Sequence, residues 1–467
     1  MSKIVIMGGA IIGQLTALLL AEDGHEVTVL ERDPAKPPAD VEDAWNSWER
    51  TGVRQFRIGH WFHAGFKRVL DGELPQVVEA LDEAGALRVN FLEGIPEEMI
   101  GGRQDGDEVY STITGRRPVV EAVVARVAAA HPGIEVLRGQ AVTSVNLEDR
   151  DGVPHLAALV TESGQEFSGD LIVDAAGRNS PTPRLLAEAG GRSPDEELED
   201  SGFIYYGRSF KSADGSLPAV LGGLNQNYDS ISILTLPADN GTWFVGIVAA
   251  GSDAEMRKVM NEETWTRVIS SYPLVSHWLD GEPTSEVKAM GKIEDRIRRC
   301  VVDGQPVVTG YAAVGDAWAC TNPSLGRGAT IGLYHALALR DQMRADPAAQ
   351  TAEWARSWSR RTEDDVEPWY SDGLGPDRLR LGEIEAQIVG ARFEPDDELY
   401  EFMRCIGSRG MEHPRLLRAL LDSALMIRKW SELLEDEELV EMAMAEPAAS
   451  AEGVGLDRSQ LLEILNA

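Results

Sequence analysis

The first thirty residues alternate between apolar runs and a glycine-rich turn. Residues 3–7 read Lys-Ile-Val-Ile-Met, a run with the length and composition of a strand buried on both faces. Residues 13–22 then place apolar side chains at helical spacing, and residues 25–31 form a second apolar run. The pattern predicts a strand–helix–strand unit of about 30 residues, the size of a βαβ motif.

Helices and short strands are predicted in the next part of the chain. Residues 34–55 are polar, rich in proline and then in tryptophan, and we interpret them as a crossing loop. Residues 60–85 and 117–130 have helical patterns, and Pro118 lies near the first turn of the second. Turn-forming residues separate the apolar runs that follow. Strands are predicted over 134–137, 141–147, 155–161 and 170–175.

Residues 203–250 alternate in the manner of strands. Segments 203–210, 230–236 and 242–248 each place apolar or aromatic residues at every second position. This pattern predicts a largely antiparallel sheet that forms a lobe separate from the first. The pattern then predicts a helix over 253–279, a strand over 307–315 and a helix over 326–344.

The chain becomes helical throughout after Ala345. Many of the expected helices have acidic faces, which is typical of solvated helices. They could cap a substrate channel or contact another protein, and the pattern leaves both open. The expected helices cover 351–370, 376–391, 396–407, 413–444 and 458–466.

Composition narrows the classes of function. The chain has 77 acidic and 44 basic residues and a formal net charge of −33, which repels nucleic acid and anionic membrane. No apolar run is long enough to span a bilayer. The three cysteines have no metal-site spacing, and we expect a cytoplasmic protein with reduced thiols. A monomer and a homodimer are both consistent with the sequence.

The turn after the first strand reads Gly8-Gly9-Ala10-Ile11-Ile12-Gly13. It follows a strand and begins a helix, which is the context of a dinucleotide-binding turn. Free N–H groups and the helix dipole favour a pyrophosphate at such a helix N-terminus. Glu31 ends the second strand, where a carboxylate can accept hydrogen bonds from ribose hydroxyls.

Two further motifs follow later strands. Residues 309–316 end in Gly-Asp316, and Pro323-Ser-Leu-Gly326-Arg327-Gly328 then leads into a helix. Asp316 can accept hydrogen bonds from a polyol, and the glycine turn can stabilise negative charge on a reduced ring. The third motif, residues 169–180, is a strand ending in a small-residue turn at Ala176 and Gly177.

Together these motifs resemble the FAD-dependent monooxygenase superfamily built like para-hydroxybenzoate hydroxylase, which includes squalene-type and polyether-type epoxidases. The resemblance covers roughly residues 3–345. It implies an α/β fold with a discontinuous Rossmann-like FAD-binding lobe (1–200 and 290–345), an inserted antiparallel β-sheet substrate lobe (201–289) and a helical C-terminal lobe (346–467).

The resemblance also assigns residues. Gly8, Gly13 and Glu31 match the ADP contacts, and Asp316 matches the aspartate on the ribityl chain. Arg117 matches an arginine that precedes the second helix. The cofactor-binding set implied in this way is Gly8, Gly9, Ala10, Ile12, Gly13, Glu31, Arg32, Gln55, Arg57, Arg117, Val142, Ala176, Gly177, Asp316, Pro323, Gly326, Gly328 and Ala329.

The stretch from Gly52 to His60 is similar to a segment of the polyether-epoxidase-like enzymes. Arg54 stands where that group has a proline. The similarity implies that Gln55, Arg57 and His60 lie near the cofactor. For His60, a role at the flavin and a purely structural role remain equally open.

The resemblance implies transfer of one oxygen atom from O2 to a small organic substrate through a flavin C4a-hydroperoxide. NADPH or NADH would supply electrons, directly or through a separate flavin reductase, because Ala176 replaces an aspartate of the motif that touches both FAD and pyridine nucleotide. Flavin-proximal candidates are Pro323, Gly326, Arg327, Gly328, Trp318 and His60. Substrate-lobe candidates are Tyr206, Arg208, Tyr228 and Trp243, together with Tyr205 and Asn225.

Three other functions compete with oxygenation. A flavin-dependent reductase of isoprenoid-type double bonds would share the fold and the motifs. A flavin halogenase is expected to carry a Trp-x-Trp-x-Ile-Pro motif and a pocket lysine, and Trp45-Asn-Ser-Trp48 does not match that motif. A non-catalytic FAD-binding or partner-binding protein would show no substrate turnover with oxygen uptake.

Overall fold

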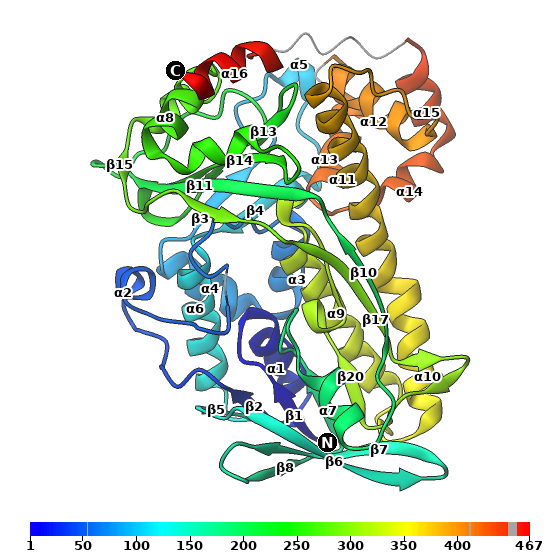
Figure 1. Ribbon diagram of the computed structural model, residues 1–467. Coiled ribbons are helices and arrows are strands. Elements are labelled where there is room, and N and C mark those ends of the chain that lie inside the picture. The colour runs from blue at the N-terminus through cyan, green and yellow to red at the C-terminus, as the bar shows by residue number, and fades with distance from the viewer. Residues whose placement is uncertain (54, 411, 447–454) are drawn as a thin grey trace.

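The computed structural model describes residues 1–53, 55–410, 412–446 and 455–467, so Arg54 lies outside the described residues. A parallel sheet lies at one end of the molecule and an antiparallel sheet at the other, and the yellow-to-orange C-terminal helices run along one side (Figure 1). Among the described residues, every helix is too short or too polar to cross a bilayer.

The first sheet contains five parallel strands in the order β20-β9-β1-β2-β5. Its strands are buried on both faces, since consecutive residues such as Ile4 and Val5 are both buried. Helices α1, α6 and α9 pack together in this lobe, and Val145 of β6 (Val142–Arg150) and Leu156 of β7 (Val153–Thr161) belong to the same core. The expected βαβ unit is present. The strands are β1 (Lys3–Met7), β2 (Glu26–Glu31), β5 (Ile134–Arg138), β9 (Leu171–Asp174) and β20 (Tyr311–Ala313), and the helices are α1 (Ile11–Glu22), α6 (Arg117–Ala130) and α9 (Gly328–Ala345).

Smaller elements surround this lobe. The segment expected to be a crossing loop contains a short helix, α2, which Asp40 caps by accepting hydrogen bonds from two backbone amides. The expected helix over 60–85 is divided by Leu74 into two. These elements are α2 (Val41–Asn46), α3 (Ala64–Glu73), α4 (Pro75–Glu83), β3 (Leu87–Asn90), α5 (Glu97–Ile100), β4 (Ser111–Thr114), β6 (Val142–Arg150), β7 (Val153–Thr161), β8 (Glu166–Ser168), α7 (Thr182–Glu188), β18 (Val301–Val302) and β19 (Gln305–Pro306).

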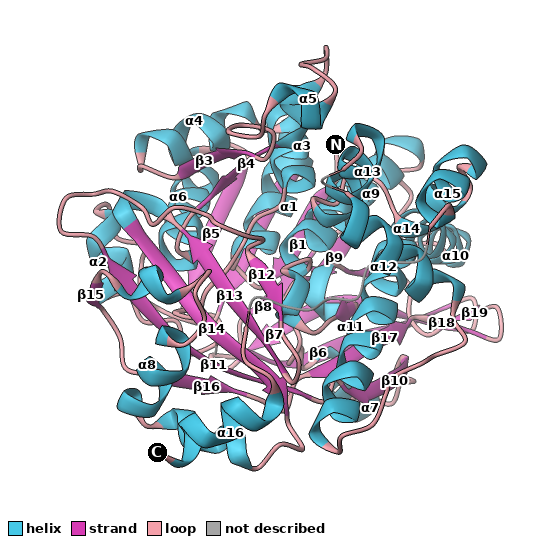
Figure 2. Ribbon diagram, turned by 90° about the horizontal axis from the view of Figure 1, so that it is seen from above, coloured by secondary structure: helices cyan, strands magenta, loops and turns pink. Residues whose placement is uncertain are grey.

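The second large sheet is antiparallel, as the alternating pattern predicts. Its order is β12-β13-β14-β11-β15, with β16 also paired to β11. Long strands β10 and β17 pair with each other and connect the two sheets (Figures 1 and 2). The elements are β10 (Asp195–Asp200), β11 (Phe203–Lys211), β12 (Asn225–Asn227), β13 (Ile231–Pro237), β14 (Thr242–Ala250), α8 (Glu262–Ser270), β15 (Glu282–Pro283), β16 (Lys288–Met290), β17 (Glu294–Arg299) and β21 (Ala319–Cys320).

The C-terminal segment is helical as predicted, but its helices belong to different cores. Trp354 and Trp358 pack into the core of the first lobe, whereas Leu461 packs under α8 in the second. Helix α11 continues through Pro376, where two helices were expected, because that turn is buried and packing outweighs the local penalty of proline. The helices are α10 (Ala352–Arg361), α11 (Glu367–Ile388), α12 (Glu398–Arg409), α13 (Pro414–Ala424), α14 (Trp430–Leu434), α15 (Glu437–Met444) and α16 (Arg458–Asn466).

Candidate functional site

The three glycine-containing motifs meet at one edge of the parallel sheet. Met7 pairs with Leu30 on β2 and with Asp174 on β9, and Ala313 pairs with Asp174 from the other side. Because the strands are parallel, the loops that leave their carboxyl ends lie side by side. The structure therefore brings together motifs that are separated by about 300 residues in the sequence.

The first turn is closely packed around its glycines. Gly8 has φ +110°, and a Cβ there would lie 2.4 Å from the Ala175 carbonyl oxygen. A Cβ on Gly13 would lie 1.9 Å from the Gly8 carbonyl oxygen. Helix α1 has no side-chain cap at Ala10 and no acidic residue in its first turn. Its N-terminal N–H groups are therefore left for an anion such as a pyrophosphate.

Glu31 is held by protein groups at this edge. Its Oε2 accepts hydrogen bonds from Gly9 N at 2.9 Å and from Arg50 Nη2 at 2.7 Å. Its Oε1 accepts one from Asp33 N at 2.8 Å. The carboxylate is buried, so its first role in this structure is to anchor the turn and Arg50. Its contact with a ribose stays a prediction.

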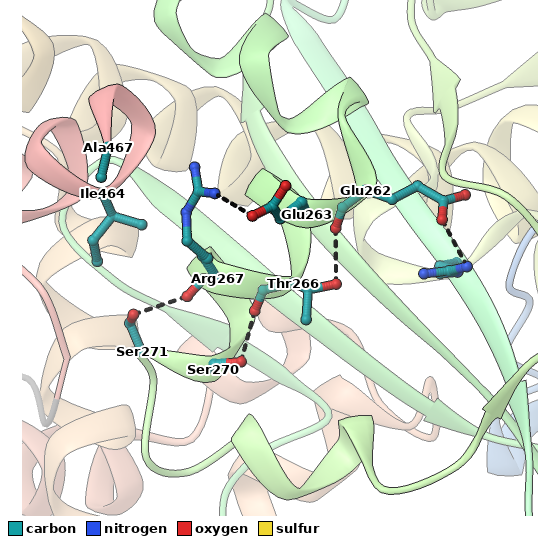
Figure 3. Close-up of a pocket in the computed structure, with 9 residues that line it drawn as sticks. Glu262, Glu263, Thr266, Arg267, Ser270, Ser271, Ile464 and Ala467 are labelled. Carbon is teal, nitrogen blue, oxygen red and sulfur yellow. Dashed lines mark hydrogen bonds and ion pairs between the residues drawn. The ribbon is translucent and has the colours of Figure 1, made fainter.

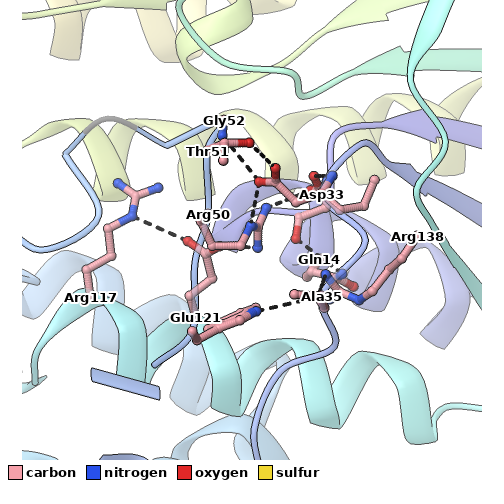
Figure 4. A network of polar contacts seen from close by, with 12 residues as sticks. Gln14, Asp33, Ala35, Arg50, Thr51, Gly52, Arg117, Glu121 and Arg138 are labelled. Atoms are coloured by element: carbon pink, nitrogen blue, oxygen red, sulfur yellow. Dashed lines mark hydrogen bonds and ion pairs between the residues drawn. The ribbon is translucent and has the colours of Figure 1, made fainter. Parts of the chain in front are cut away.

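Arg50 is the centre of a buried charge network (Figure 4). Its guanidinium is 1% exposed and pairs with Glu31, Asp33 and Glu121. Burial by itself lowers the pKa of Arg50, but Glu121 and Glu31 outweigh burial and the pKa is raised overall. Sequence reasoning missed this residue because its partners lie on separate elements and no local motif marks it.

Arg117 and His60 form a contact that the sequence did not predict. Arg117 Nη1 donates to His60 Nε2 at 3.1 Å, and His60 Nδ1 donates to the Ile58 carbonyl oxygen at 2.8 Å. Burial, and then the charge of Arg117, lower the pKa of His60 to about 3. His60 is therefore neutral and orients Arg117, whose Nε also contacts Glu121 at 3.3 Å.

Other predicted cofactor residues have mainly structural contacts. Arg57 donates to the carbonyl oxygens of Trp45 and Trp48 at 2.6 and 2.9 Å, which fixes the tryptophan-rich loop. Arg32 is exposed and lies beside Gly52. Gln55 and Val142 are partly buried, and their roles stay predictions.

Asp316 has the chemistry expected of a polyol-binding group. It follows β20 in a turn that His335 supports, because His335 Nδ1 accepts a hydrogen bond from Gly315 N at 3.3 Å. The Asp316 carboxylate is half-buried and accepts no hydrogen bond from the described residues. Burial raises its pKa, while Arg117 and Arg178 act in the opposite direction. A carboxylate beside two arginines fits a chain of hydroxyls that ends in phosphate.

The loop before α9, residues 322–327, is followed by a glycine with open space beside it. Gly326 has φ +64°, and helix α9 begins at Gly328 without a side-chain cap. A Cβ on Gly328 would meet only Asp316 Oδ1, at 3.9 Å, and one on Gly177 would meet nothing within 4 Å. His63 Nε2 donates to the Leu325 carbonyl oxygen at 2.7 Å and supports the loop from behind. The two uncapped helix N-termini, Asp316 and the open glycines together fit FAD.

Trp318 lies behind this loop rather than beside open space. It is 6% exposed and packs against His335 and Tyr370, with ring centroids 4.7 and 6.2 Å apart. It belongs to the core of the first lobe, and its expected place near the flavin stays a prediction.

The two faces of β11 point to different parts of the molecule. Adjacent strand residues point to opposite faces. The Tyr205 hydroxyl donates to Asn322 Oδ1 at 2.6 Å, toward the loop before α9. Tyr206 packs into the core beneath α8 with Trp265.

Four of the predicted substrate residues lie on the α8 face of the sheet, and their contact with a substrate stays a prediction. Arg208 pairs with Glu262 of α8 at 2.9 Å, and the aromatic candidates pack beneath α8. A recess of about 740 Å³ on this face is lined by Arg208, Arg267 and Ala467, away from the cofactor edge (Figure 3). The alternating pattern predicted the strands but not which of their side chains face the loop before α9. The four residues on the α8 face are Tyr206, Arg208, Tyr228 and Trp243.

Comparisons with known proteins agree with this architecture. No protein-family profile matches the chain. Protein Rv3254 of Mycobacterium tuberculosis is 25% identical over 401 residues, which are 79% of each chain. The flavin-dependent halogenase CmlS superposes with a TM-score of 0.59 at 18% identity, covering 93% of this chain and 78% of that chain. A probable FAD-dependent monooxygenase, pqsL from Pseudomonas aeruginosa, superposes with a TM-score of 0.55 at 17% identity, covering 82% of this chain and 99% of that chain.

The chain shares its fold with these flavin-dependent halogenase and probable FAD-dependent monooxygenase structures. This confirms the predicted α/β fold class with its C-terminal helices. At identities of 17–18% the similarity concerns the fold and does not assign a reaction to this chain.

Proposed function

We propose that this chain is an FAD-dependent monooxygenase that inserts one oxygen atom of O2 into a small organic substrate, by hydroxylation or epoxidation. In the overall reaction the substrate, O2, NAD(P)H and a proton give the oxygenated substrate, water and NAD(P)⁺. Bound FAD would supply the activation of oxygen, and the protein would supply orientation and a dry site.

The observation that carries the proposal is the position of the Asp316 carboxylate next to the uncapped N-termini of α1 and α9. Asp316 would hold the ribityl chain, and the α1 N-terminus would hold the pyrophosphate. Arg117, oriented by neutral His60, would add positive charge beside them. NADPH or NADH would supply electrons, directly or through a separate flavin reductase.

FAD binding is the first test. We expect Asp316→Ala to weaken FAD binding by about tenfold to a hundredfold, because hydrogen bonds to a charged group contribute about 1.5–3 kcal/mol each. Asp341→Ala on the exposed side of α9 is the matched control and should bind FAD like the parent. Flavin fluorescence during titration measures both. Equal affinities of the two variants would show that Asp316 is not a cofactor ligand.

The reaction class needs a second test. FAD-loaded protein is photoreduced and mixed rapidly with dissolved oxygen, with and without electron-rich aromatic and alkene compounds. A transient spectrum distinct from oxidised and reduced flavin, followed by an oxygenated product, supports the monooxygenase. Direct return to oxidised flavin under all conditions, with reduction of isoprenoid-type double bonds by the reduced protein, supports the reductase alternative.

Halogenation is the second function that the comparisons raise, because CmlS shares the fold. Including bromide and chloride in the same assay tests it. We expect no halogenated product, since Trp45 and Trp48 do not form the motif of those enzymes.

A further inference from the structure

A chain of hydrogen bonds joins the sheet, the loop before α9 and helix α11. The Tyr205 hydroxyl donates to Asn322 Oδ1 at 2.6 Å, and Asn322 Nδ2 donates to Ser324 Oγ at 3.0 Å. Ser324 Oγ then donates to the carboxyl group of Asp377 on α11. Tyr205, Asn322 and Asp377 are almost fully buried. All three hydrogen bonds are donated in the direction of Asp377, so the carboxyl group of Asp377 is the final acceptor of the network.

A buried cation lies next to this network. Arg327 belongs to the Gly326–Gly328 turn and is 5% exposed. Its Nη1 has no hydrogen-bond partner among the described residues. Burial lowers the pKa of Arg327, while Asp372 and Asp377 act to raise it. The charge of Asp377 therefore contributes, together with that of Asp372, to balancing the charge of Arg327.

The groups facing Asp377 come from β17 and from the loop before α9. Asp295 of β17 carries a like charge and Arg327 the opposite charge, Ser324 donates a hydrogen bond to the carboxyl group, and Asn322 lies behind Ser324. Burial is the largest influence and raises the pKa of Asp377 to about 7, which Asp295 reinforces and the other three groups oppose. The carboxyl group can therefore gain or lose its proton near neutral pH.

We propose that Asp377 is a positioning residue that controls the flavin-facing loop: through Ser324 it holds residues 323–328 against α11, and by exchanging a proton it sets the net charge beside Arg327. This inference rests on the proposed FAD function. Asn322 serves to orient Ser324, since an amide side chain donates and accepts without exchanging protons readily.

The test is the reduction potential of bound FAD as a function of pH. The potential is measured by equilibrium redox titration from about pH 5 to about pH 9, a range that brackets the ordinary and raised values of a carboxyl group. The wild-type protein should show a change of slope near neutral pH. Reduction adds negative charge near Asp377, so the ionised carboxylate takes up a proton together with the electrons, whereas a carboxyl group that is already protonated cannot. Asp377→Asn should remove the change of slope. Glu385→Gln, on an exposed position of the same helix, should keep it.

Ser324→Ala tests the link and covers the case in which Asp377→Asn fails to fold. Ser324 lowers the pKa of Asp377, so its removal should move the change of slope to higher pH. A merely structural hydrogen bond would leave the position unchanged. The proposal is overturned if wild type and Asp377→Asn, both holding FAD, give the same pH dependence, or if Ser324→Ala leaves it in place. Failure of the wild-type protein to bind FAD would overturn the proposed function and this inference with it.

Discussion

At the scale of single residues, Asp377 makes stability depend on pH. Its pKa is about 7 in the folded protein against 3.8 for an ordinary aspartate, so the folded state holds its proton more tightly. The stabilisation is fully present below about pH 4 and is lost as pH rises through about 7. Asp377→Asn should therefore gain up to about 4 kcal/mol of unfolding free energy relative to wild type between these limits.

Denaturant unfolding of the two proteins at a series of pH values measures this difference. The comparison uses protein without added FAD, so that it reports on the carboxyl group independently of cofactor chemistry. Glu385→Gln should run parallel to wild type at every pH. A difference between wild type and Asp377→Asn that is constant with pH would mean that Asp377 titrates normally.

Arg50, unlike Asp377, is a buried charge that is compensated by ion pairs with three carboxylates. Removing one member of a buried ion network leaves the others uncompensated and costs about 3–5 kcal/mol. We expect Arg50→Ala to lose stability of this order, because Glu31, Asp33 and Glu121 would remain buried. Arg356→Ala removes an exposed pair with Glu353 and should cost less than about 1 kcal/mol. Chemical denaturation of both variants would show whether the network is as important as its geometry indicates.

At the scale of elements, two glycines within helices provide a matched comparison. A Cβ on Gly13 of α1 would lie 1.9 Å from the Gly8 carbonyl oxygen, whereas one on Gly72 of α3 would meet nothing within 4 Å. Gly13→Ala should displace the turn and abolish FAD retention. Gly72→Ala should raise stability by about 0.5–1 kcal/mol, since alanine favours helix. Flavin content after gel filtration, together with thermal unfolding, distinguishes the two. Normal flavin content in Gly13→Ala would place the cofactor elsewhere.

The same scale explains what the sequence could predict. The turn from Gly8 to Gly13 obeys local rules, so strand, turn and helix were predicted nearly to the residue. The alternation in β11 predicted a strand with two faces, but only the docking of the sheet decides that Tyr205 rather than Tyr206 points to the loop before α9. The contacts of Asp377 also depend on long-range docking, and no spacing in the sequence marks them.

At the scale of the whole molecule, the C-terminal segment contributes to several cores: helices α12–α15 form one of their own, whereas α10 and α16 each join the core of another part of the chain. Leu461 and Leu465 of α16 are 1% and 4% exposed and pack under α8 with Trp265 and Trp278. Arg458 adds a buried pair with Asp253 at 2.6 Å. The end of the chain therefore completes the core of the antiparallel-sheet lobe, while the parallel sheet has its own core. This arrangement predicts that the two lobes can be destabilised separately.

Leu461→Ala tests that separation. Truncating a fully buried leucine costs about 2–5 kcal/mol, and the loss should lower the unfolding temperature seen by fluorescence, since Trp265 and Trp278 lie in the affected core. The dissociation constant of FAD, measured below that transition, should change by less than about twofold because α16 packs mainly on α8 and the short 3₁₀ helix before it, whereas the predicted cofactor residues lie in the parallel-sheet lobe. Glu463→Ala on the exposed face of α16 is the control and should leave both quantities unchanged. If FAD binding weakened in step with stability, the lobes would unfold as one cooperative unit, and the antiparallel-sheet lobe would have to be regarded as part of the cofactor site.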